Sequence, residues 1–413
     1  MCKMNRDFFH RVYMYLKDGS FFHRLWIHLF FTRKFYKVYN FFRPQRINPK
    51  KIVMCNFVGL GYGCNPKYLA EYILSHNLDY EIVWFMDSHK LKPGNTFPKN
   101  IRTVELFSKE AVKELSSAGI WIDNCRKGWF PRKKPCQLYV QTWHGGFACK
   151  KIEKDAPHLP KSYVKLARKD SKTIDLITTD SSVNTAIFRN SFWYSGEILE
   201  CGTPRTDIFF DKQKVTAATI KIHDEYKIPH ATKIALYAPT FRQSLTLAPY
   251  MLDYESAQKF LEEKFGGDWQ LCVRLHPNVA LKSAELNIPE NVNDLSDYAD
   301  MQEILCASDA VITDYSGIMF DYWFLSRPVF LFATDYEEYT ENDRAFYVPI
   351  EKLPFSIAKN NEELKKNIEN FDDEDFCRKL DSFKSEYGIA SDGHACQKVM
   401  EWLENKQREI FGK

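Results

Sequence analysis

From residue 51 onwards, short apolar runs alternate with longer helical patterns, and this alternation restricts the possible folds more than any other feature of the chain. Such an alternation is typical of parallel strands joined by helices. The sequence therefore predicts an α/β protein with two doubly wound, Rossmann-like sheets. The expected strands lie at residues 51–57, 80–86, 119–124, 138–143, 175–180 and 197–202 in the first half, and at residues 233–239, 269–277, 309–316 and 328–333 in the second.

The length and the apolar content are sufficient for two separate cores. A chain of 413 residues exceeds one ordinary domain, and 45% of it is apolar, including 32 Phe and 22 Tyr. The polar stretch at residues 210–233 is the expected linker, part of which is expected to be helical, and residues 393–411 are expected to form a terminal helix. We therefore expect a basic N-terminal segment at residues 1–50, a first domain at 51–215, and a second domain at 216–413 that includes the terminal helix.

The cysteines and carboxylates do not form the patterns of a metal site. The eleven cysteines are scattered, with no CxxC pair and no Cys/His cluster at zinc spacing. This distribution indicates reduced thiols in a cytosolic protein. Because the sequence also contains no carboxylate cluster of metal-site character, we expect no cofactor and no obligatory bound metal.

The N-terminal segment differs in charge from the rest of the chain. Residues 1–51 contain twelve Lys or Arg against Asp7 and Asp18, a net charge near +10 in a chain whose total is +3, so the remainder is near −7. Large apolar residues fill residues 21–42, but charged residues and histidines interrupt every run, so no stretch is suited to cross a bilayer. A helix with aromatic residues on one side and basic residues on the other would lie among lipid headgroups. We expect a basic amphipathic helix on an anionic membrane surface, with packing against the protein's own body as the alternative.

Polar or glycine-bearing loops follow five of the expected strands. Ligands of open α/β sheets bind beyond the carboxyl ends of the strands, so these loops are the candidate site. They read "WHGG", "GTPRTD", "APTFR", "RLHP" and "TDYSGIMFD". Their polar side chains are those of His144, Arg205, Asp207, Thr240, Arg242, Arg274, His276, Ser316 and Asp321. Because the loops belong to both sheets, we expect a cleft between two domains, lined by groups that suit phosphate oxygens.

Two histidines in these loops have a catalytic and a structural interpretation. His144 precedes two glycines that permit close backbone approach, and a histidine in that setting can act as a general base. A strand-end histidine bonded to a backbone carbonyl explains the same pattern. His276 lies two residues after Arg274 on one strand face, which suits a phosphate-binding pair, although a structural turn before the next proline is equally compatible.

Two further loops are also open to two interpretations. Ser316 precedes a helix whose first amides would hold an anion, but it would equally serve as a plain helix cap. Asp321, one turn later, would accept hydrogen bonds from a sugar or polyol. Arg205 would either reach a phosphate or pair with Asp207.

Six motifs, taken in order, resemble the CDP-glycerol glycerophosphotransferase family, which includes teichoic acid primases and polymerases and related capsule enzymes. They are "NFVGLGYGCNPKYLAEYI", "VQTWHGG", "ECGTPRTDIF", "LYAPTFR", "VRLHP" and "ITDYSGIMFDYWFLSRPVFLFATDYEEY". The resemblance runs from about residue 50 to the end. It implies the two-domain architecture of B-type (GT-B) glycosyltransferases and a peripheral protein on the cytoplasmic face of the bacterial cell membrane.

The resemblance also implies roles for the two domains and for the loops. It makes residues 51–215 the acceptor side and residues 216–413 the CDP-donor side. The loop with Gly59, Gly61 and Gly63 lacks the GxGxxG spacing of dinucleotide-binding loops, and we give it a binding role near the acceptor.

The resemblance assigns His144 and His276 as the catalytic pair. The residues that it places around the CDP-linked donor are Trp143, Gly145, Gly146, Phe147, Arg205, Pro239, Thr240, Arg274, Leu275, Ser316, Gly317 and Asp321. We add Arg242, which lies in the same loops, to this set of expected substrate-binding residues. Two departures stand out. Family members usually have Thr or Ser followed by Pro where this chain has Gly146 and Phe147, and often a second Ser where it has Gly317. Each change removes a hydroxyl, so the identity of the transferred polyol stays open.

The implied reaction transfers glycerol phosphate from CDP-glycerol to a hydroxyl of a lipid-linked or polymeric acceptor, with CMP as the leaving group. A CDP-ribitol phosphotransferase and a nucleotide-sugar glycosyltransferase are the enzymatic alternatives, and a catalytically silent membrane scaffold is the non-enzymatic one. The basic aromatic segment would also suit single-stranded nucleic acid, but the resemblance argues against a nucleic-acid partner. A lipid-linked disaccharide, a growing polyol phosphate chain and a capsular sugar are all compatible acceptors, in teichoic acid or capsule synthesis.

Overall fold

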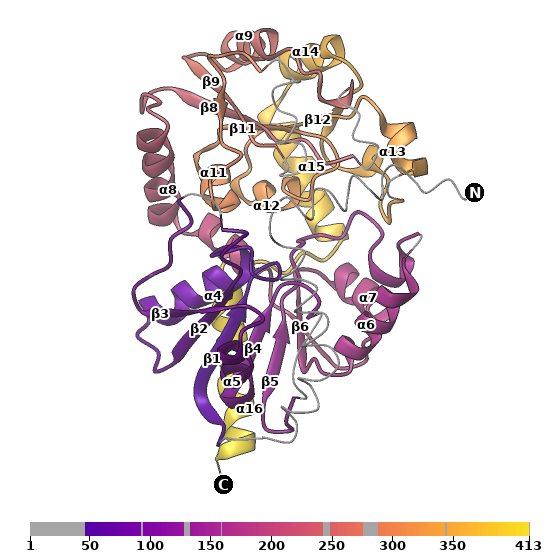
Figure 1. The fold of residues 1–413 in the computed structure, drawn as a ribbon. Helices are drawn as coiled ribbons and strands as arrows, with labels where there is room; N and C mark the ends of the chain where they lie inside the picture. Colours follow the sequence, from indigo (N-terminus) through magenta and orange to yellow (C-terminus); the bar gives the residue numbers. More distant parts are fainter. Residues whose placement is uncertain are drawn as a thin grey trace, which may run out of the picture.

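The chain forms two parallel β-sheets, each flanked by helices, one in the lower and one in the upper half of Figure 1. The computed structural model describes residues 46–91, 94–127, 133–157, 159–242, 248–275, 288–342 and 345–412. The expectation of two doubly wound α/β sheets is confirmed. Nearly all of the predicted basic N-terminal segment lies outside the described residues. Within the described part of the chain, no helix is long and apolar enough to cross a membrane.

The first sheet has seven parallel strands in the order β3-β2-β1-β4-β5-β6-β7. The strands are β1 (Asn48–Cys55), β2 (Glu81–Met86), β3 (Ile101–Glu105), β4 (Ala118–Asp123), β5 (Leu138–Gln141), β6 (Leu176–Thr179) and β7 (Glu197–Glu200). The connecting helices are α4 (Cys64–Ser75), α5 (Lys109–Ser117), η2 (Glu153–Asp155), α6 (Lys161–Ser171), α7 (Ser182–Ser191) and η3 (Pro204–Phe210). The strand order reverses between β1 and β4, so the loops after these strands lie where such sheets bind ligands.

The second sheet has six parallel strands in the order β10-β9-β8-β11-β12-β13. The strands are β8 (Lys233–Tyr237), β9 (Trp269–Val273), β10 (Asn293–Asp294), β11 (Ala310–Thr313), β12 (Val329–Phe332) and β13 (Ser356–Ala358). The helices are α8 (Lys212–Glu225), η4 (Ala248–Tyr250), α9 (Tyr254–Phe265), α11 (Met301–Ala307), α12 (Met319–Tyr322), η6 (Trp323–Leu325), α13 (Tyr336–Asn342), η7 (Ile350–Lys352), α14 (Asn361–Glu369), α15 (Asp373–Glu386) and α16 (Ala395–Phe411).

Burial explains which strands the sequence predicted. Every residue of β4, β5, β11 and β12 is buried, because helices cover both faces of a parallel sheet and the strands become continuous apolar runs. The three strands that were not predicted, β3, β10 and β13, are all edge strands. β3 exposes two of its five residues, and β10 and β13 are only two and three residues long, so none of them has an apolar run.

Side-chain caps fix where many helices begin. A Ser, Asp or Asn side chain accepts a hydrogen bond from a first-turn amide, which satisfies a group that the helix itself leaves unbonded. The capping residues are Ser108 for α5, Ser181 for α7, Asp211 for α8, Asp253 for α9, Asp300 for α11, Asn360 for α14 and Asp372 for α15.

A buried ionic cluster joins the two halves of the molecule. Lys67 of α4 forms ion pairs with Asp300, the cap of α11, and with Glu303 at 2.8 Å. Burial alone would raise the pKa of Glu303, but the charges and hydrogen bonds of Lys67 and Lys221 outweigh it and lower this pKa to about 2. The cluster therefore holds Glu303 as a carboxylate between two ammonium groups.

The terminal helix α16 follows the second sheet in the chain but packs against the first, as Figure 1 shows. Tyr80 donates to Gln407 at 3.0 Å, and Trp402 donates to Glu197 at 2.6 Å. The start of α16 is fixed by Asp207 of η3, whose carboxylate accepts from the amides of Ala395 and Cys396 at 3.0 and 2.8 Å. The expected domain boundary at residue 215 stays a prediction.

Replacing Asp207 by Ala removes this cap, and we expect the free energy of unfolding to fall by about 1 kcal/mol, the usual loss for a helix cap. Urea unfolding monitored by circular dichroism measures it, with Asp79→Ala, at an exposed carboxylate, as the control. A variant whose midpoint and slope match those of the parent would contradict the capping role.

Candidate active site

His144 lies in the loop that follows β5, a strand near the middle of the first sheet. The loop bends sharply at Trp143, whose φ of 53° is in the left-handed region. This conformation is held by a hydrogen bond from the Trp143 amide to the Gln141 side chain at 2.9 Å and by the contact of the indole with Phe192, with ring centroids 4.8 Å apart. Strain of this kind persists only where the surroundings enforce it and is common at functional sites.

The imidazole of His144 is oriented by a backbone carbonyl. Its Nδ1 lies 2.8 Å from the carbonyl oxygen of Asn124, the residue after β4. A carbonyl can only accept, so Nδ1 carries the proton and the lone pair of the neutral ring is on Nε2. The two interpretations of this histidine are therefore compatible, because the structural hydrogen bond sets the tautomer that a general base needs.

Asn124 links His144 to the glycine-bearing loop after β1. Its side-chain oxygen accepts from the Phe57 amide at 2.8 Å, and its side-chain nitrogen donates to Asn56 at 2.7 Å. Asn56 in turn donates to the carbonyl of Gly61 at 3.2 Å. Three loops that follow adjacent strands are thus fixed to one another by buried amide groups.

The two glycines after His144 differ in their surroundings. Among the described residues, a Cβ atom at Gly145 would meet only Trp143, at 3.8 Å. At Gly146 it would lie 3.2 Å from a carboxylate oxygen of Asp321 and 3.4 Å from one of Asp180. The absence of a side chain at Gly146 therefore lets the chain pass close to two carboxylates.

Phe147, which the sequence placed near the donor, is a core residue in the structure. Its side chain is buried and packs against the rings of Phe320 and Trp323 from the α12 region and of Phe383 and Tyr387 at the end of α15. Its packing attaches the loop after β5 to the second half of the molecule.

Arg205 pairs with Asp321 and not with Asp207, one of the partners considered from the sequence. Its Nε donates to Asp321 at 2.8 Å and its Nη2 donates to the other carboxylate oxygen at 3.1 Å. A further hydrogen bond runs from Nη1 to the carbonyl oxygen of His144, and the Arg205 amide donates to Asn65 at 3.0 Å. The predicted site residues His144, Gly146, Arg205 and Asp321 are thereby brought together.

Asp180, which was not among the predicted site residues, lies beside this group. It follows β6 and is bonded by Asn184 and Ser181. Burial raises the pKa of Asp180 to about 7, and the negative charge of Asp321 contributes to the rise, while those hydrogen bonds oppose it. The same rule that identified the other loops, polar residues at the carboxyl end of a strand, would have found Asp180 in "LITTD" and Asn124 in "WIDN".

The loop after β8 is held by carboxylates of the second sheet. The Thr240 amide donates to both oxygens of Asp314, at 2.8 and 3.0 Å. Arg242 is buried and bonds Asp335 through two nitrogens at 2.6 and 2.9 Å and Asp314 at 2.8 Å. Its guanidinium also lies over the ring of Tyr315. Arg242 thus neutralises the carboxylates of Asp314 and Asp335, which follow β11 and β12.

Arg274 and Leu275 follow β9. The Leu275 amide donates to Ser296 at 2.8 Å. Among the described residues the buried Nη1 of Arg274 has no hydrogen-bond partner. Burial lowers the pKa of Arg274, although Asp300 and neighbouring tyrosines oppose the change. His276, the second predicted catalytic residue, lies outside the described residues.

Ser316 and Gly317 lie in the turn between β11 and α12, where Gly317 is exposed. The residue that caps α12 is Ile318, and in the described part of the chain no capping side chain bonds the first amides of this short helix. Simple capping therefore does not explain Ser316. Pro239, the remaining predicted residue, is buried at the start of the loop after β8.

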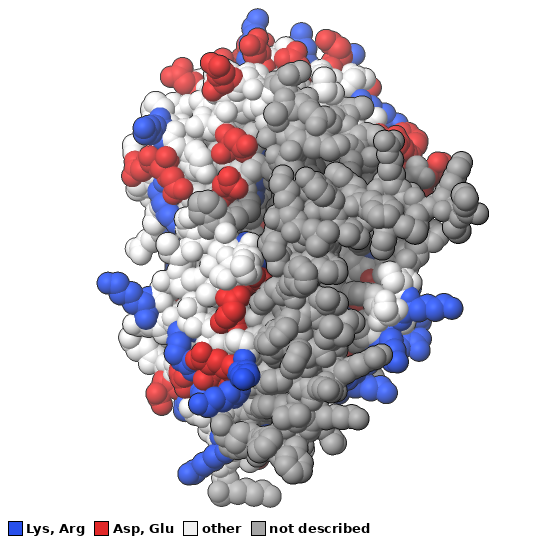
Figure 2. Space-filling view, viewed as in Figure 1, with Lys and Arg blue, Asp and Glu red and all other residues white. Residues whose placement is uncertain are grey.

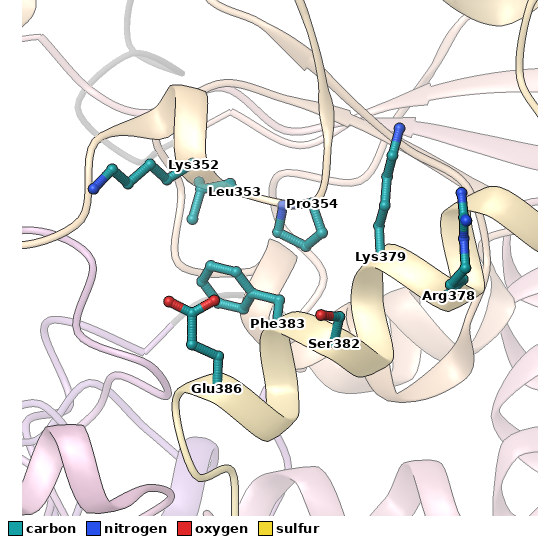
Figure 3. A pocket seen from close by; sticks show the side chains of 8 residues that line it. All are labelled: Lys352, Leu353, Pro354, Arg378, Lys379, Ser382, Phe383 and Glu386. Atoms are coloured by element: carbon teal, nitrogen blue, oxygen red, sulfur yellow. The ribbon is translucent and has the colours of Figure 1, made fainter.

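A pocket between η7 and α15 lies apart from these residues. Figure 3 shows Lys352, Leu353 and Pro354 on one side and α15 on the other, with Arg378 and Lys379 projecting from the helix. None of the predicted site residues that the structure describes is among the residues that line it. Phe383, which lines this pocket, also packs its ring on Phe147 of the loop after β5.

The raised pKa of Asp180 predicts a pH dependence of stability. Between about pH 4, the usual carboxyl pKa, and about pH 7, the folded chain keeps a proton that the unfolded chain has released, so this group's contribution to the free energy of unfolding falls as the pH rises. Asp180→Asn removes the titration. We expect its free energy of unfolding to fall less than that of the parent between pH 5 and pH 8, by roughly 2 kcal/mol. Urea unfolding at several pH values tests this, with Asp79→Asn as the surface control, and parallel curves for Asp180→Asn and the parent would contradict it.

Comparison with known proteins identifies a single family. The family model described as CDP-Glycerol:Poly(glycerophosphate) glycerophosphotransferase matches residues 36–405. The teichoic acid poly(glycerol phosphate) polymerase of Staphylococcus epidermidis is 30% identical over 380 residues, which cover 89% of this chain and 52% of that protein. This chain therefore spans about half the length of that relative. The teichoic acid glycerol-phosphate transferase of Staphylococcus aureus is 29% identical over 385 residues, 89% of this chain and 97% of that protein.

Solved structures agree with this assignment. The wall teichoic acid polymerase TagF is 28% identical, with a TM-score of 0.79 over 96% of this chain and 99% of that chain. A TagF variant in which a histidine is replaced by asparagine, solved with CDPG, has the same TM-score at 27% identity. A protein described as a UDP-N-acetylglucosamine 2-epimerase from Listeria monocytogenes, 16% identical with a TM-score of 0.50 over 87% of this chain and 97% of that chain, shares the fold alone. The chain belongs to the CDP-glycerol:poly(glycerophosphate) glycerophosphotransferase family.

Proposed function

We propose that this chain is an enzyme that transfers glycerol phosphate from CDP-glycerol to a hydroxyl of a teichoic acid acceptor and releases CMP. The observation that carries the proposal is the His144 ring, whose Nδ1 is bonded to the Asn124 carbonyl in a loop that Arg205 ties to the second sheet. Family membership and the glycerol phosphate enzymes among the relatives support the choice of donor.

In the proposed reaction the acceptor oxygen attacks the β-phosphorus of CDP-glycerol. A bond forms between that oxygen and phosphorus, the bond from phosphorus to the bridging oxygen breaks, and CMP leaves with the bridging electron pair. His144 takes the acceptor proton on Nε2. Phosphoryl transfer of this kind depends on in-line positioning and on compensation of spreading negative charge more than on covalent help from the protein.

Arg274 is the arginine best suited to the diphosphate. Arg205 forms two hydrogen bonds with the buried carboxylate of Asp321, and Arg242 forms two with the carboxylate of Asp335, so both guanidinium charges are already neutralised. The buried Nη1 of Arg274 has no such partner among the described residues, and a buried donor without one is costly. A phosphate oxygen would satisfy it. His276, next to this residue in the motif, is proposed to protonate or stabilise the departing CMP.

The reaction is proposed to need no bound metal. Among the described residues, no three His, Cys, Asp or Glu side chains gather in a way that would hold a metal ion. In the proposal, guanidinium groups and backbone amides compensate the phosphate charge instead.

The protein is proposed to work at the cytoplasmic face of the membrane, where a lipid-linked acceptor would be presented. The charge of residues 1–51 supports this. Exposed basic side chains of α6 support it as well, and Figure 2 shows basic side chains gathered at the edge of the molecule where α6 lies. The basic residues of α6 are Lys161, Lys165, Arg168 and Lys169.

Replacing His144 by Ala is expected to slow CMP release from CDP-glycerol by about a hundredfold or more, because general bases typically contribute that much. CMP release by purified protein with lipid-linked acceptors is the measurement, and His230→Ala, at an exposed histidine paired with Asp224, is the matched control. Turnover by His144→Ala at the parent rate would refute the assignment.

The same assay separates the alternatives. Parallel reactions with CDP-ribitol and UDP-sugars identify the donor, since relatives of this chain include a teichoic acid ribitol-phosphate primase that is 30% identical over 285 residues. Binding of CDP-glycerol without CMP release would favour the scaffold interpretation.

A further inference from the structure

The loop between β1 and α4 exposes two large apolar side chains beside the candidate base. Among the described residues only six large apolar side chains are exposed, and two of them, Phe57 and Leu60, are on this loop, at 37% and 39%. The residues on either side, including Asn56 and Gly61, are buried. The exposure is therefore local to the tip of the loop.

The loop is held rigidly in a strained conformation. Phe57 and Val58 have φ values of 41° and 54°, in the left-handed region that costs a non-glycine residue on the order of 1 kcal/mol or more. Three hydrogen bonds hold it there: from the Phe57 amide to Asn124 at 2.8 Å, from the Asp87 amide to the Gly59 carbonyl at 2.9 Å, and from the Lys90 ammonium to the Val58 carbonyl at 2.9 Å. The aromatic ring is thus fixed at the surface by its backbone.

The position of Phe57 relative to His144 is set by one residue. Asn124 accepts the Phe57 amide with its side chain and the His144 Nδ1–H with its backbone carbonyl. The two rings lie 5.0 Å apart between centroids, with an angle of 54° between their planes. A substrate group that rests on the phenyl ring would therefore be next to the imidazole.

The loop also borders the second half of the molecule, since a Cβ atom at Gly63 would lie 4.0 Å from the Ala299 carbonyl oxygen. The proposed donor contacts, such as Thr240 and Arg274, follow strands of the second sheet. A phenyl ring offers no charge and no hydrogen bond to a phosphate, but its face packs well against the carbon-bound hydrogens of a polyol or a sugar.

We infer that the loop from Phe57 to Gly63 is the acceptor subsite, and that Phe57 determines acceptor affinity by supporting the carbon face of the terminal polyhydroxylated unit while a hydroxyl of that unit faces His144. This inference rests on the proposed function. It assigns Phe57 a binding role and leaves proton transfer to His144.

Kinetics with the full chain test the inference. Replacing Phe57 by Ala is expected to raise the KM for a short synthetic glycerol phosphate oligomer or for a lipid-linked disaccharide by about tenfold, with little change in kcat, as for an interaction made equally in ground and transition states. The affinity for CDP-glycerol, measured calorimetrically without acceptor, is expected to be unchanged. Phe57→Tyr keeps the ring and is expected to stay within threefold of the parent, as is Phe411→Ala, which removes an equally exposed phenyl ring, 37%, from the end of α16.

The outcomes are distinguishable. A parent protein that transfers glycerol phosphate to neither acceptor contradicts the proposed function itself, and the subsite with it. An active parent and a Phe57→Ala variant with the parent's acceptor KM overturn the subsite alone. If Phe57→Ala also loses donor affinity, its fold is damaged and Phe57→Tyr decides: an acceptor KM near the parent's supports the subsite, and a large increase overturns it.

Discussion

The ion pair between Arg205 and Asp321 is the interaction on which the geometry of the site depends. Arg205 lies on η3, next to the first sheet, and Asp321 lies on α12, which follows a strand of the second sheet. The same guanidinium bonds the carbonyl of His144, and the Arg205 amide bonds Asn65. One residue therefore sets the position of the loop after β5, which contains His144, relative to both sheets. Breaking a buried pair of this kind by removing one partner leaves an uncompensated charge in a poorly solvated environment, which is costly.

Near this pair, the group that orients the His144 ring carries no charge. His144 is oriented by a neutral carbonyl, so its tautomer is fixed without adding another negative charge to a region that already contains Asp180 and Asp321. A carboxylate in place of that carbonyl would repel the diphosphate of a nucleotide donor. Two carboxylates that lie close together disfavour each other's ionised form. At Asp180, burial and the negative charge of Asp321 raise the pKa to about 7. In the second sheet the buried Nη1 of Arg274 has no hydrogen-bond partner among the described residues, and under the proposed function it would compensate the negative charge of the donor.

Much of the architecture could be predicted from the sequence, because buried parallel strands are apolar runs and their carboxyl ends converge. All ten predicted strands are present, and the loops after them contain His144, Arg205 and Asp321, which the structure brings together. Edge strands such as β3 were missed because their partly exposed residues do not form an apolar run.

The partners of polar side chains were harder to predict from the sequence than the strands were. Arg205 has a carboxylate two residues away in Asp207, yet it pairs with a residue 116 positions later, while Asp207 caps a helix that begins 188 positions away. Such choices depend on how the two sheets pack, which local sequence does not encode. For the same reason, the sequence did not indicate that Arg242 bonds Asp314 and Asp335 or that Phe147 packs against Phe320.

A double-mutant cycle between Arg205 and Asp321 tests the central claim most directly. Free energies of unfolding would be measured for the parent, for Arg205→Ala, for Asp321→Ala and for the double variant. If the pair spans the two halves as described, each single variant loses about 3–5 kcal/mol and the double variant loses less than the sum, with a coupling of about 2 kcal/mol or more. Losses that add to within about 0.5 kcal/mol would show that the two residues act independently, and would contradict the account.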